Sequence, residues 1–219
     1  IDVTEFCRTA SEPELRTAML HYSFMIQAYV WGEPDAPKSV PACIAAPLWK
    51  IADAIGQPPL LPYSSYTLEN WGRHDPNGPI DLSNIHTLQH FEGGMDEAWF
   101  ILVHVAIEAR AGELLDEATK LVDAAKTKDH AAIRHSLQAQ SKAWDDVNAI
   151  FDRMPERCDP YVYFHRVRPW IHGWKDNPAL GPGLIYEGVA QTKGAPQAFR
   201  GQTGSQSSIV PAMDALYGI

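Results

Sequence analysis

Apolar residues recur at helical spacing through most of this chain. Residues 15–31 (LRTAMLHYSFMIQAYVW) are apolar on nearly every side, which predicts a buried helix. Residues 41–56 predict a second helix, which should end at Gly56 because two prolines follow it closely. The aromatic segment LLPYSSYTLENW comes next, and its pattern fits an extended or a helical conformation equally well.

Two longer amphipathic helices should follow the break at Gly93 and Gly94. The first starts near Asp96, and its apolar stripe consists of Phe100, His104, Ile107, Ala111, Leu114, Ala118, Leu121 and Ala125. The second covers roughly residues 129–154, and its apolar face consists of Ile133, Leu137, Trp144, Val147 and Phe151. Asp159 and Pro160 then suit the N-cap and first turn of a helix through the FHRVR segment.

Signals for β-strands are nearly absent, and no internal repeat appears. The chain has 219 residues, enough to bury one substantial core. We therefore expect an all-α fold in which residues 1–219 form a single helical domain. The chain starts at Ile1 rather than Met and stops at MDALYGI, where a helical pattern has just begun. We expect a piece of a longer protein, with a fold that is incomplete at the C-terminus.

Charge and cysteine content limit the possible binding partners and the cellular compartment. A net charge of −9 with scattered basic residues argues against binding to nucleic acid or to a membrane surface. No apolar stretch approaches the length that spans a bilayer. The three cysteines, Cys7, Cys43 and Cys158, are widely spaced, as expected of reduced thiols in the cytoplasm.

One arginine stands among aromatic side chains near the C-terminal end. Arg168 lies close in sequence to Tyr163, Phe164, Trp170 and Trp174. An arginine in such a setting suits a flat apolar ligand that carries a carboxylate. The alternative for Arg168 is an ion pair with an Asp or Glu of the same chain.

Residues 201–208 (GQTGSQSS) form a glycine-rich loop that opens a helix. Backbone N–H groups collect at a helix N-terminus and favour the anionic edge of a ligand. The spacing matches neither a P-loop nor a dinucleotide fingerprint. The alternative for this loop is a flexible connection.

His104 is the histidine with the most informative position. It lies on the apolar stripe near Phe100 and Ile107, so we expect its ring to point inward. A buried imidazole can exchange a proton near neutral pH or bind a metal. The alternative is a core histidine whose ring is hydrogen-bonded to a backbone carbonyl. The other histidines form no credible zinc site, and no HExxH or GxSxG motif occurs.

Several segments match one protein family in order. They are IQAYVWGE, LPYSSYTLENW, DPNGPIDLSNI and AWFILVHVAIEA, then YFHRVRPWIHGWKDNPAL, GLIYEGV and FRGQTGSQSS. Together they resemble the indoleamine 2,3-dioxygenases, which are all-helical heme enzymes. The resemblance runs from about residue 22 to residue 219. It implies a multi-helix heme dioxygenase fold, with residues 1–219 forming the central part of the catalytic domain.

The resemblance also implies an activity. Heme b would bind dioxygen, and both oxygen atoms would enter the indole C2–C3 bond of L-tryptophan or another indoleamine. The product would be N-formylkynurenine, in the kynurenine pathway, made by a cytoplasmic monomer. The chain alone is expected to be inactive. Two alternatives stay open: a related heme enzyme that acts differently on tryptophan derivatives, and a non-catalytic helical binding protein.

The family's functional residues carry over position by position. Arg168 resembles the arginine that holds the substrate carboxylate. Positions that would contact the substrate are Tyr63, Phe100, Tyr163, Thr203 and Gly204. Positions that would border the heme are Gly204, Ser205 and Asp214, the last of which resembles an acid of the heme-propionate network. The arginine partner of Asp214 should lie beyond residue 219.

The chain departs from the family pattern in two ways, first at His104 and Tyr163 and second in the lack of a proximal histidine. His104 stands where the better-known mammalian indoleamine enzymes have serine, and the related tryptophan 2,3-dioxygenases use a distal histidine. We therefore expect His104 to act as a catalytic residue that hydrogen-bonds the indole N–H. Tyr163 replaces the usual phenylalanine. No histidine follows His172, so no metal ligand is assigned, and the proximal heme histidine is expected outside this chain.

Overall fold

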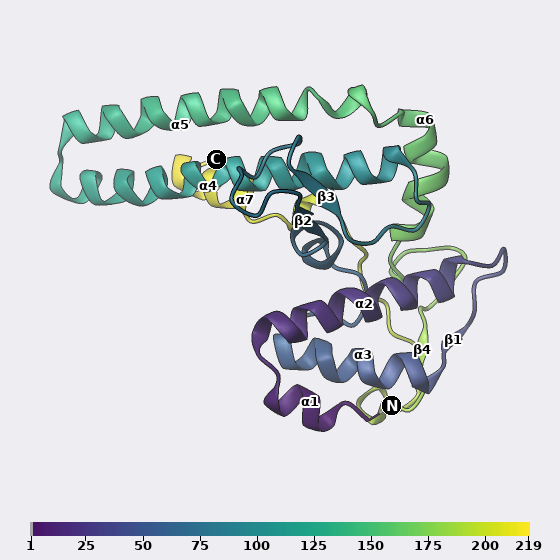
Figure 1. Ribbon diagram of the computed structural model, residues 1–219. Coiled ribbons are helices and arrows are strands. Elements are labelled where there is room, and N and C mark those ends of the chain that lie inside the picture. Colours follow the sequence, from purple (N-terminus) through teal and green to yellow (C-terminus); the bar gives the residue numbers. More distant parts are fainter. Residues whose placement is uncertain (1) are drawn as a thin grey trace. The chain divides into compact units, whose positions relative to one another are not determined.

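The computed structural model describes residues 2–219 and is predominantly helical (Figure 1). The α-helices are α1 (Thr4–Thr9), α2 (Glu12–Trp31), α3 (Ala42–Ile55), α4 (Met95–Thr127), α5 (His130–Phe151), α6 (Pro160–Val162) and α7 (Ile209–Tyr217). Two π-helices occur, η1 (Ser64–Leu68) and η3 (Tyr163–Val167). The 3₁₀-helices are η2 (Met154–Glu156), η4 (Arg168–Ile171), η5 (Ala190–Thr192) and η6 (Gly204–Gln206). The predicted all-α class is confirmed.

Extended structure in residues 2–219 consists of two short pairs of strands and an isolated antiparallel bridge between Leu184 and Gln197. β1 (Ser39–Val40) pairs in parallel with β4 (Ile185–Tyr186). β2 (Trp71–Arg73) pairs antiparallel with β3 (Ile85–Thr87). None of the helices in residues 2–219 has the length and hydropathy needed to cross a bilayer.

The chain divides into two compact units. Unit 1 contains the chain up to Asn70 together with Gln89–Gly93 and Pro160–Gln206. Unit 2 contains Trp71–Leu88, Gly94–Asp159 and Ser207–Ile219. Each unit has its own apolar core, so each is held together by contacts between segments that are distant in sequence.

The first two long helices of unit 1 begin and end where local signals place them. At the start of α2, the Ser11 amide donates to the Glu14 carboxylate over 2.8 Å, as in a capping box. The helix is exposed at Met25 and Tyr29, so the prediction of burial on nearly every side is wrong there. α3 ends at Gly56, as predicted, and its φ of 68° is a left-handed conformation that glycine adopts readily.

The core of unit 1 contains a buried pair of aromatic hydrogen bonds. Trp174 Nε1 donates to the Tyr186 hydroxyl over 2.7 Å, and that hydroxyl donates to the Pro59 carbonyl over 2.8 Å. Apolar side chains of α2, α3 and β4 surround the pair. Three segments far apart in sequence are therefore joined inside one core.

Unit 2 is built on the hairpin of α4 and α5, which lie side by side (Figure 1). Lys128 makes the turn between them with a φ of 54°. α7 packs on the same hairpin, and its Ile209 and Met213 are buried. The cluster they join also contains Ala111, Leu114, Ala143 and Val147.

The predicted apolar face of α5 is only partly correct, because Val147 is buried and Trp144 packs against the same core, but other members are exposed. Leu137 and Phe151 are 44% and 55% exposed, whereas the side chains that face α4 include Ser136 and Gln140. Ser136 Oγ donates to the Glu117 carbonyl over 2.7 Å, and Gln140 Nε2 donates to Ser136 Oγ over 3.3 Å. The Tyr217 hydroxyl of α7 donates to Gln140 Oε1 over 2.7 Å. Polar groups with partners occupy the contact face, which a purely apolar pattern does not reveal.

Tyr186→Phe should destabilise the intact protein by about 1–3 kcal/mol, because it leaves Trp174 Nε1 and the Pro59 carbonyl buried without a partner. Urea unfolding measures the change. Tyr29→Phe removes a hydroxyl from an exposed position and is the matched control. Equal stability of the two variants would contradict the prediction.

Candidate functional site

The segment that carries Arg168 changes helix type twice within 12 residues. α6 begins at Pro160, as predicted, and passes into the π-helix η3 and then the 3₁₀-helix η4. The Arg168 amide donates to the Tyr163 carbonyl five residues earlier, which is the hydrogen bond of a π-turn. Pro169 follows and has no amide hydrogen to continue the ladder.

Arg168 is exposed, and Glu92 pairs with Arg166 two residues before it. Within residues 2–219, Arg168 forms no ion pair with a carboxylate. The structural ion pair, which was the alternative for this residue, is therefore not found in the described part of the chain. The guanidinium is accessible to a ligand carboxylate.

Two glycines bring the end of this segment against the start of the 201–208 loop. A Cβ placed on Gly173 would lie 2.0 Å from the Gly201 nitrogen, and one on Gly201 would lie 2.3 Å from the Gly173 nitrogen. Neither position has room for a side chain. The Trp174 amide donates to the Phe199 carbonyl over 2.8 Å at the same crossing. The two motifs singled out in the sequence therefore meet through their backbones.

Gln206 ties the loop to Tyr63. Its Oε1 accepts a hydrogen bond from the Tyr63 amide over 2.8 Å. Its own amide donates to the Thr203 carbonyl over 2.9 Å, closing the η6 turn. Thr203, Gly204 and Ser205 are exposed along that turn. Small side chains and exposed backbone suit the edge of a flat anionic group.

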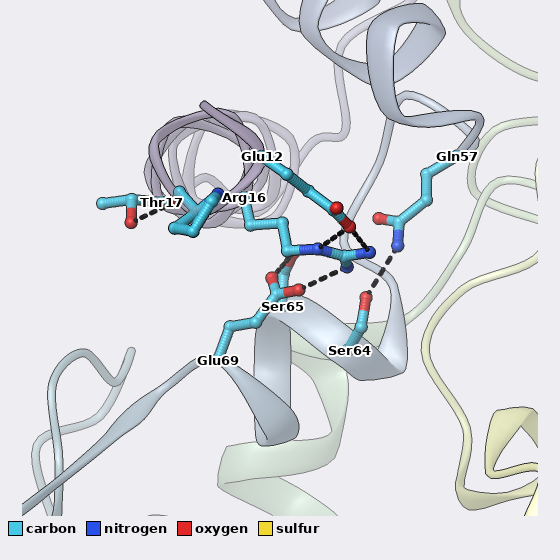
Figure 2. Close-up of polar contacts among 8 residues, drawn as sticks. Glu12, Arg16, Thr17, Gln57, Ser64, Ser65 and Glu69 are labelled. Atoms are coloured by element: carbon cyan, nitrogen blue, oxygen red, sulfur yellow. Dashed lines mark hydrogen bonds and ion pairs between the residues drawn. The ribbon is translucent and has the colours of Figure 1, made fainter. Parts of the chain in front are cut away.

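The segment after Tyr63 is anchored by polar contacts, which Figure 2 shows. Arg16 of α2 reaches Glu69 at 2.8 Å, and its Nη2 also contacts Glu12 at 2.6 Å. Gln57 Nε2 donates to Ser64 Oγ over 3.1 Å. The segment forms a π-helix, which confirms the helical one of its two predicted conformations. Tyr63 at its start is buried.

Phe100 and His104 lie together on α4 in unit 2. His104 Nδ1 is 2.8 Å from the Phe100 carbonyl oxygen, and the two rings are 4.4 Å apart. A carbonyl oxygen can only accept, so Nδ1 carries the hydrogen. Burial lowers the pKa of His104, which keeps the ring neutral near pH 7. The carbonyl bond agrees with the core-histidine interpretation, although both side chains are only half-buried.

The expected inward stripe of α4 is therefore only partly correct. Three members of the stripe, Phe100, His104 and Ile107, are half-buried. Apolar residues on other sides of the helix, such as Ile101 and Val103, are buried. β3 and η2 also cover α4 in this unit. A helix buried on several sides has no single inward face.

Asp214 and Tyr163 complete the predicted positions, and both are half-buried. Asp214 lies on α7, where its carbonyl accepts the Gly218 and Ile219 amides over 2.9 and 3.0 Å. Tyr163 opens η3, five residues before Arg168. Unit 1 thus brings together Tyr63, Arg168 and the 203–205 turn, and unit 2 holds the Phe100–His104 pair.

Sequence reasoning missed three contributors to this arrangement. Gln206 and Glu92 contact partners 143 and 78 residues away, so no local pattern marks them. Gly173 could have been recognised, since a glycine between aromatic residues is often a point of close backbone approach.

A protein-family model described as indoleamine 2,3-dioxygenase matches residues 1–219. The chain belongs to this family. It is 35% identical to rat indoleamine 2,3-dioxygenase 1 (Rattus norvegicus) over 206 residues, which is 93% of the chain and 50% of that protein. It is 32% identical to human indoleamine 2,3-dioxygenase 2 (Homo sapiens) over 208 residues, 94% of the chain and 50% of that protein.

More distant relatives match over the same extent. The indoleamine 2,3-dioxygenase of Saccharomyces cerevisiae is 31% identical over 214 residues, which is 94% of the chain and 47% of that protein. The chain spans about half the length of the curated relatives it matches. The sequence resemblance to the family is therefore confirmed along the whole chain.

The indoleamine 2,3-dioxygenase family is heme-dependent. In residues 2–219, no group of three or more His, Cys, Asp or Glu side chains could hold a metal ion. A heme iron takes its protein ligand from a single residue such as histidine. The described residues fit the border of such a cofactor, through the exposed 203–205 turn, and we assign none of them as its axial ligand.

The free energy of unfolding should fall as the pH drops below about 6.5, because burial lowers the pKa of His104 and histidine in the unfolded chain therefore binds a proton more readily. The pKa of His172 is lowered too, by burial and by the charge of Arg168, and adds a slope of the same sign. Urea unfolding between about pH 8 and 5.5 measures the slope.

His104→Gln should flatten that slope relative to the unsubstituted protein. Carboxylates with lowered pKa values, such as Glu14 and Glu117, stay ionised in this range and leave the comparison undisturbed. An unchanged slope in the variant would show that His104 titrates alike in the folded and unfolded states.

Proposed function

We propose that the protein containing this chain is a heme-dependent dioxygenase that cleaves the indole C2–C3 bond of L-tryptophan or a related indoleamine. The product would be N-formylkynurenine, in the kynurenine pathway. The backbone contact between Gly173 and Gly201 is the observation that carries the proposal, since it joins the Arg168 segment to the exposed 203–205 turn. The names of the relatives, all indoleamine 2,3-dioxygenases, support it.

Heme b is the cofactor of this proposal, and when bound it supplies the activation of dioxygen. Its axial histidine would come from a part of the protein outside residues 1–219. Gly204 and Ser205 would border the cofactor, because small exposed residues let a flat ring approach the backbone. Asp214 would belong to the network around the propionates.

Arg168 would bind the carboxylate of tryptophan. A guanidinium presents two parallel N–H groups that match a carboxylate, and that of Arg168 is exposed. Thr203 and Gly204 would lie near the substrate ammonium group. Tyr63 and Tyr163 would offer apolar ring surfaces to the indole, which favours flat aromatic substrates.

Phe100 would add an apolar surface for the indole, and His104 would accept a hydrogen bond from the indole N–H. The tautomer of His104 favours this role. Nδ1 carries the hydrogen because it donates to the Phe100 carbonyl, so in the neutral ring Nε2 is the acceptor. An indole N–H can only donate, and Nε2 therefore has the complementary chemistry.

We also propose a domain organisation, an oligomeric state and a compartment for the enzyme. Both units would belong to one catalytic domain of a cytoplasmic monomer. The three cysteines are free, which agrees with a reducing compartment. The net charge of −9 gives no support to a nucleic-acid partner.

Aerobic turnover of L-tryptophan by the reduced, heme-loaded full-length protein tests the function. Arg168→Ala should raise KM for L-tryptophan by about tenfold or more and change kcat less, because the carboxylate contact forms before the chemistry. Arg134→Ala removes an exposed arginine of α5 and should leave both constants unchanged. If N-formylkynurenine does not form with the unsubstituted protein, the proposed function is wrong.

His104→Ala should alter selectivity more than stability. Tryptophan carries an indole N–H and 1-methyltryptophan does not, so the variant should lose turnover of tryptophan. The ratio of kcat/KM for tryptophan to kcat/KM for 1-methyltryptophan should fall by roughly tenfold. His130→Ala removes an exposed histidine of α5 and serves as the control. A variant that loses both substrates equally, or that fails to fold, would restore the core-histidine interpretation.

A further inference from the structure

The short segment Gln89–Gly93 lies against the helix that carries Arg168, within unit 1. Glu92 accepts two hydrogen bonds from that helix. Its Oε2 is 2.9 Å from Arg166 Nη2, and its Oε1 is 2.8 Å from Trp170 Nε1. One carboxylate thus binds the second residue before Arg168 and the second residue after it.

Phe91 strengthens the contact. Its ring lies parallel to the Trp170 indole, with an interplanar angle of 2° and centroids 5.4 Å apart. Phe91 also stacks on Phe24 of α2, with centroids 4.5 Å apart. The Trp170 side chain is therefore fixed from its face by Phe91 and from its N–H by Glu92.

Arg168 stands where the backbone itself gives little rigidity. The π-helix η3 ends there and the 3₁₀-helix η4 begins, so the hydrogen-bond pattern changes at this residue, and the 3₁₀ pattern has poorer hydrogen-bond geometry than an α-helix. Pro169 contributes no amide donor to the turn. Side-chain contacts from outside the segment must therefore supply the missing constraint.

The far end of the segment is held separately. Trp31 Nε1 donates to the His172 carbonyl over 3.1 Å, and Gln27 Nε2 approaches the same oxygen at 3.4 Å. These contacts come from α2 and do not involve Glu92. Loss of Glu92 should consequently loosen the middle of the segment while its C-terminal end stays in place.

Glu92 also distinguishes between two arginines. Arg166 and Arg168 are two residues apart, and either guanidinium could bind a carboxylate. Glu92 pairs with Arg166, whereas Arg168 forms no ion pair with another of the described residues 2–219. The pairing neutralises a competing cation near the residue that is to meet the ligand.

We propose that Glu92 is a positioning residue for the substrate carboxylate: it binds the side chains of Arg166 and Trp170, which flank Arg168, and so orders this segment and keeps Arg166 occupied. This inference rests on the proposed function, in which Arg168 binds that carboxylate. It predicts that Glu92 controls substrate affinity through the carboxylate and leaves the chemistry on the indole largely unaffected.

The test compares Glu92→Ala and Glu92→Gln in the heme-loaded full-length protein, with L-tryptophan and with tryptamine, which has no carboxylate. Glu92→Ala should raise KM for L-tryptophan about tenfold and leave kcat within about twofold, as expected for a displaced binding group. Its KM for tryptamine should change by less than about twofold, since Arg168 has no contact to lose. Glu92→Gln should fall between, because the amide oxygen still accepts the Trp170 N–H.

Glu117→Gln is the matched control, because it removes one carboxylate of an ion pair with similar exposure. Lys120 and Glu117 are 67% and 14% exposed, against 66% and 24% for Arg166 and Glu92. This control lies in unit 2 and should leave both substrates unaffected. Equal effects of Glu92→Ala on tryptophan and tryptamine, or none on either, would overturn the proposal.

Amide hydrogen exchange over residues 163–171 gives a readout that does not depend on turnover. Faster exchange in Glu92→Ala, with unchanged exchange in α5, supports the positioning role, and identical exchange overturns it. If the unsubstituted protein fails to cleave tryptophan, the proposed function fails by that result alone. The exchange measurement then decides whether Glu92 orders the Arg168 segment.

Discussion

The direct contact of two glycine backbones is the constraint on which the candidate site of unit 1 depends. Gly173 follows the Arg168 segment and Gly201 opens the exposed loop, and no Cβ fits at either position. The Trp174 and Lys175 amides both donate to the Phe199 carbonyl beside this contact. The Arg168 segment and the 201–208 loop are thus joined by one short backbone junction.

Two sets of side-chain contacts hold the segments on either side of this junction. Gln206 holds the loop against the Tyr63 amide, and Glu92 holds the Arg168 segment by its flanking residues. Gln206 accepts from a backbone N–H through its amide oxygen, and Glu92 accepts from two side-chain donors through its carboxylate oxygens. Polar side chains therefore add constraints where the chain must present functional groups.

Local signals predicted the helices well and the packing less well. Gly56 and the Asp159–Pro160 pair mark helix ends through their own backbone preferences, so the sequence alone located α3 and α6. The π-type of η3 has no such signal, because its residues would also suit an α-helix. The buried face of α5 was predicted only in part: Val147 is buried, but so are the polar Ser136 and Gln140, whose hydrogen-bond partners lie on other segments or on α5 itself.

The same limit applies to the candidate site. Arg168 and the glycine-rich loop were identified from residue type and resemblance, and they lie together. Glu92 could not be identified, because its contacts join residues 74 to 78 positions apart. The tautomer of His104 also depends on a specific carbonyl, that of Phe100, and on the degree of burial. The contacts of Glu92 and the tautomer of His104 are set by the folded structure and cannot be read from the sequence.

The polar contacts between α4, α5 and α7 have a consequence for how the hairpin assembles. An interface of alanine and other small side chains would tolerate sliding of one helix along the other by a turn, about 5.4 Å. In such a displaced alignment Ser136 and Gln140 would be buried away from Glu117 and Tyr217, with their hydrogen bonds unmade. The hydrogen bonds of Ser136 and Gln140 therefore act chiefly by destabilising wrong alignments of the helices, and so give the hairpin a single register.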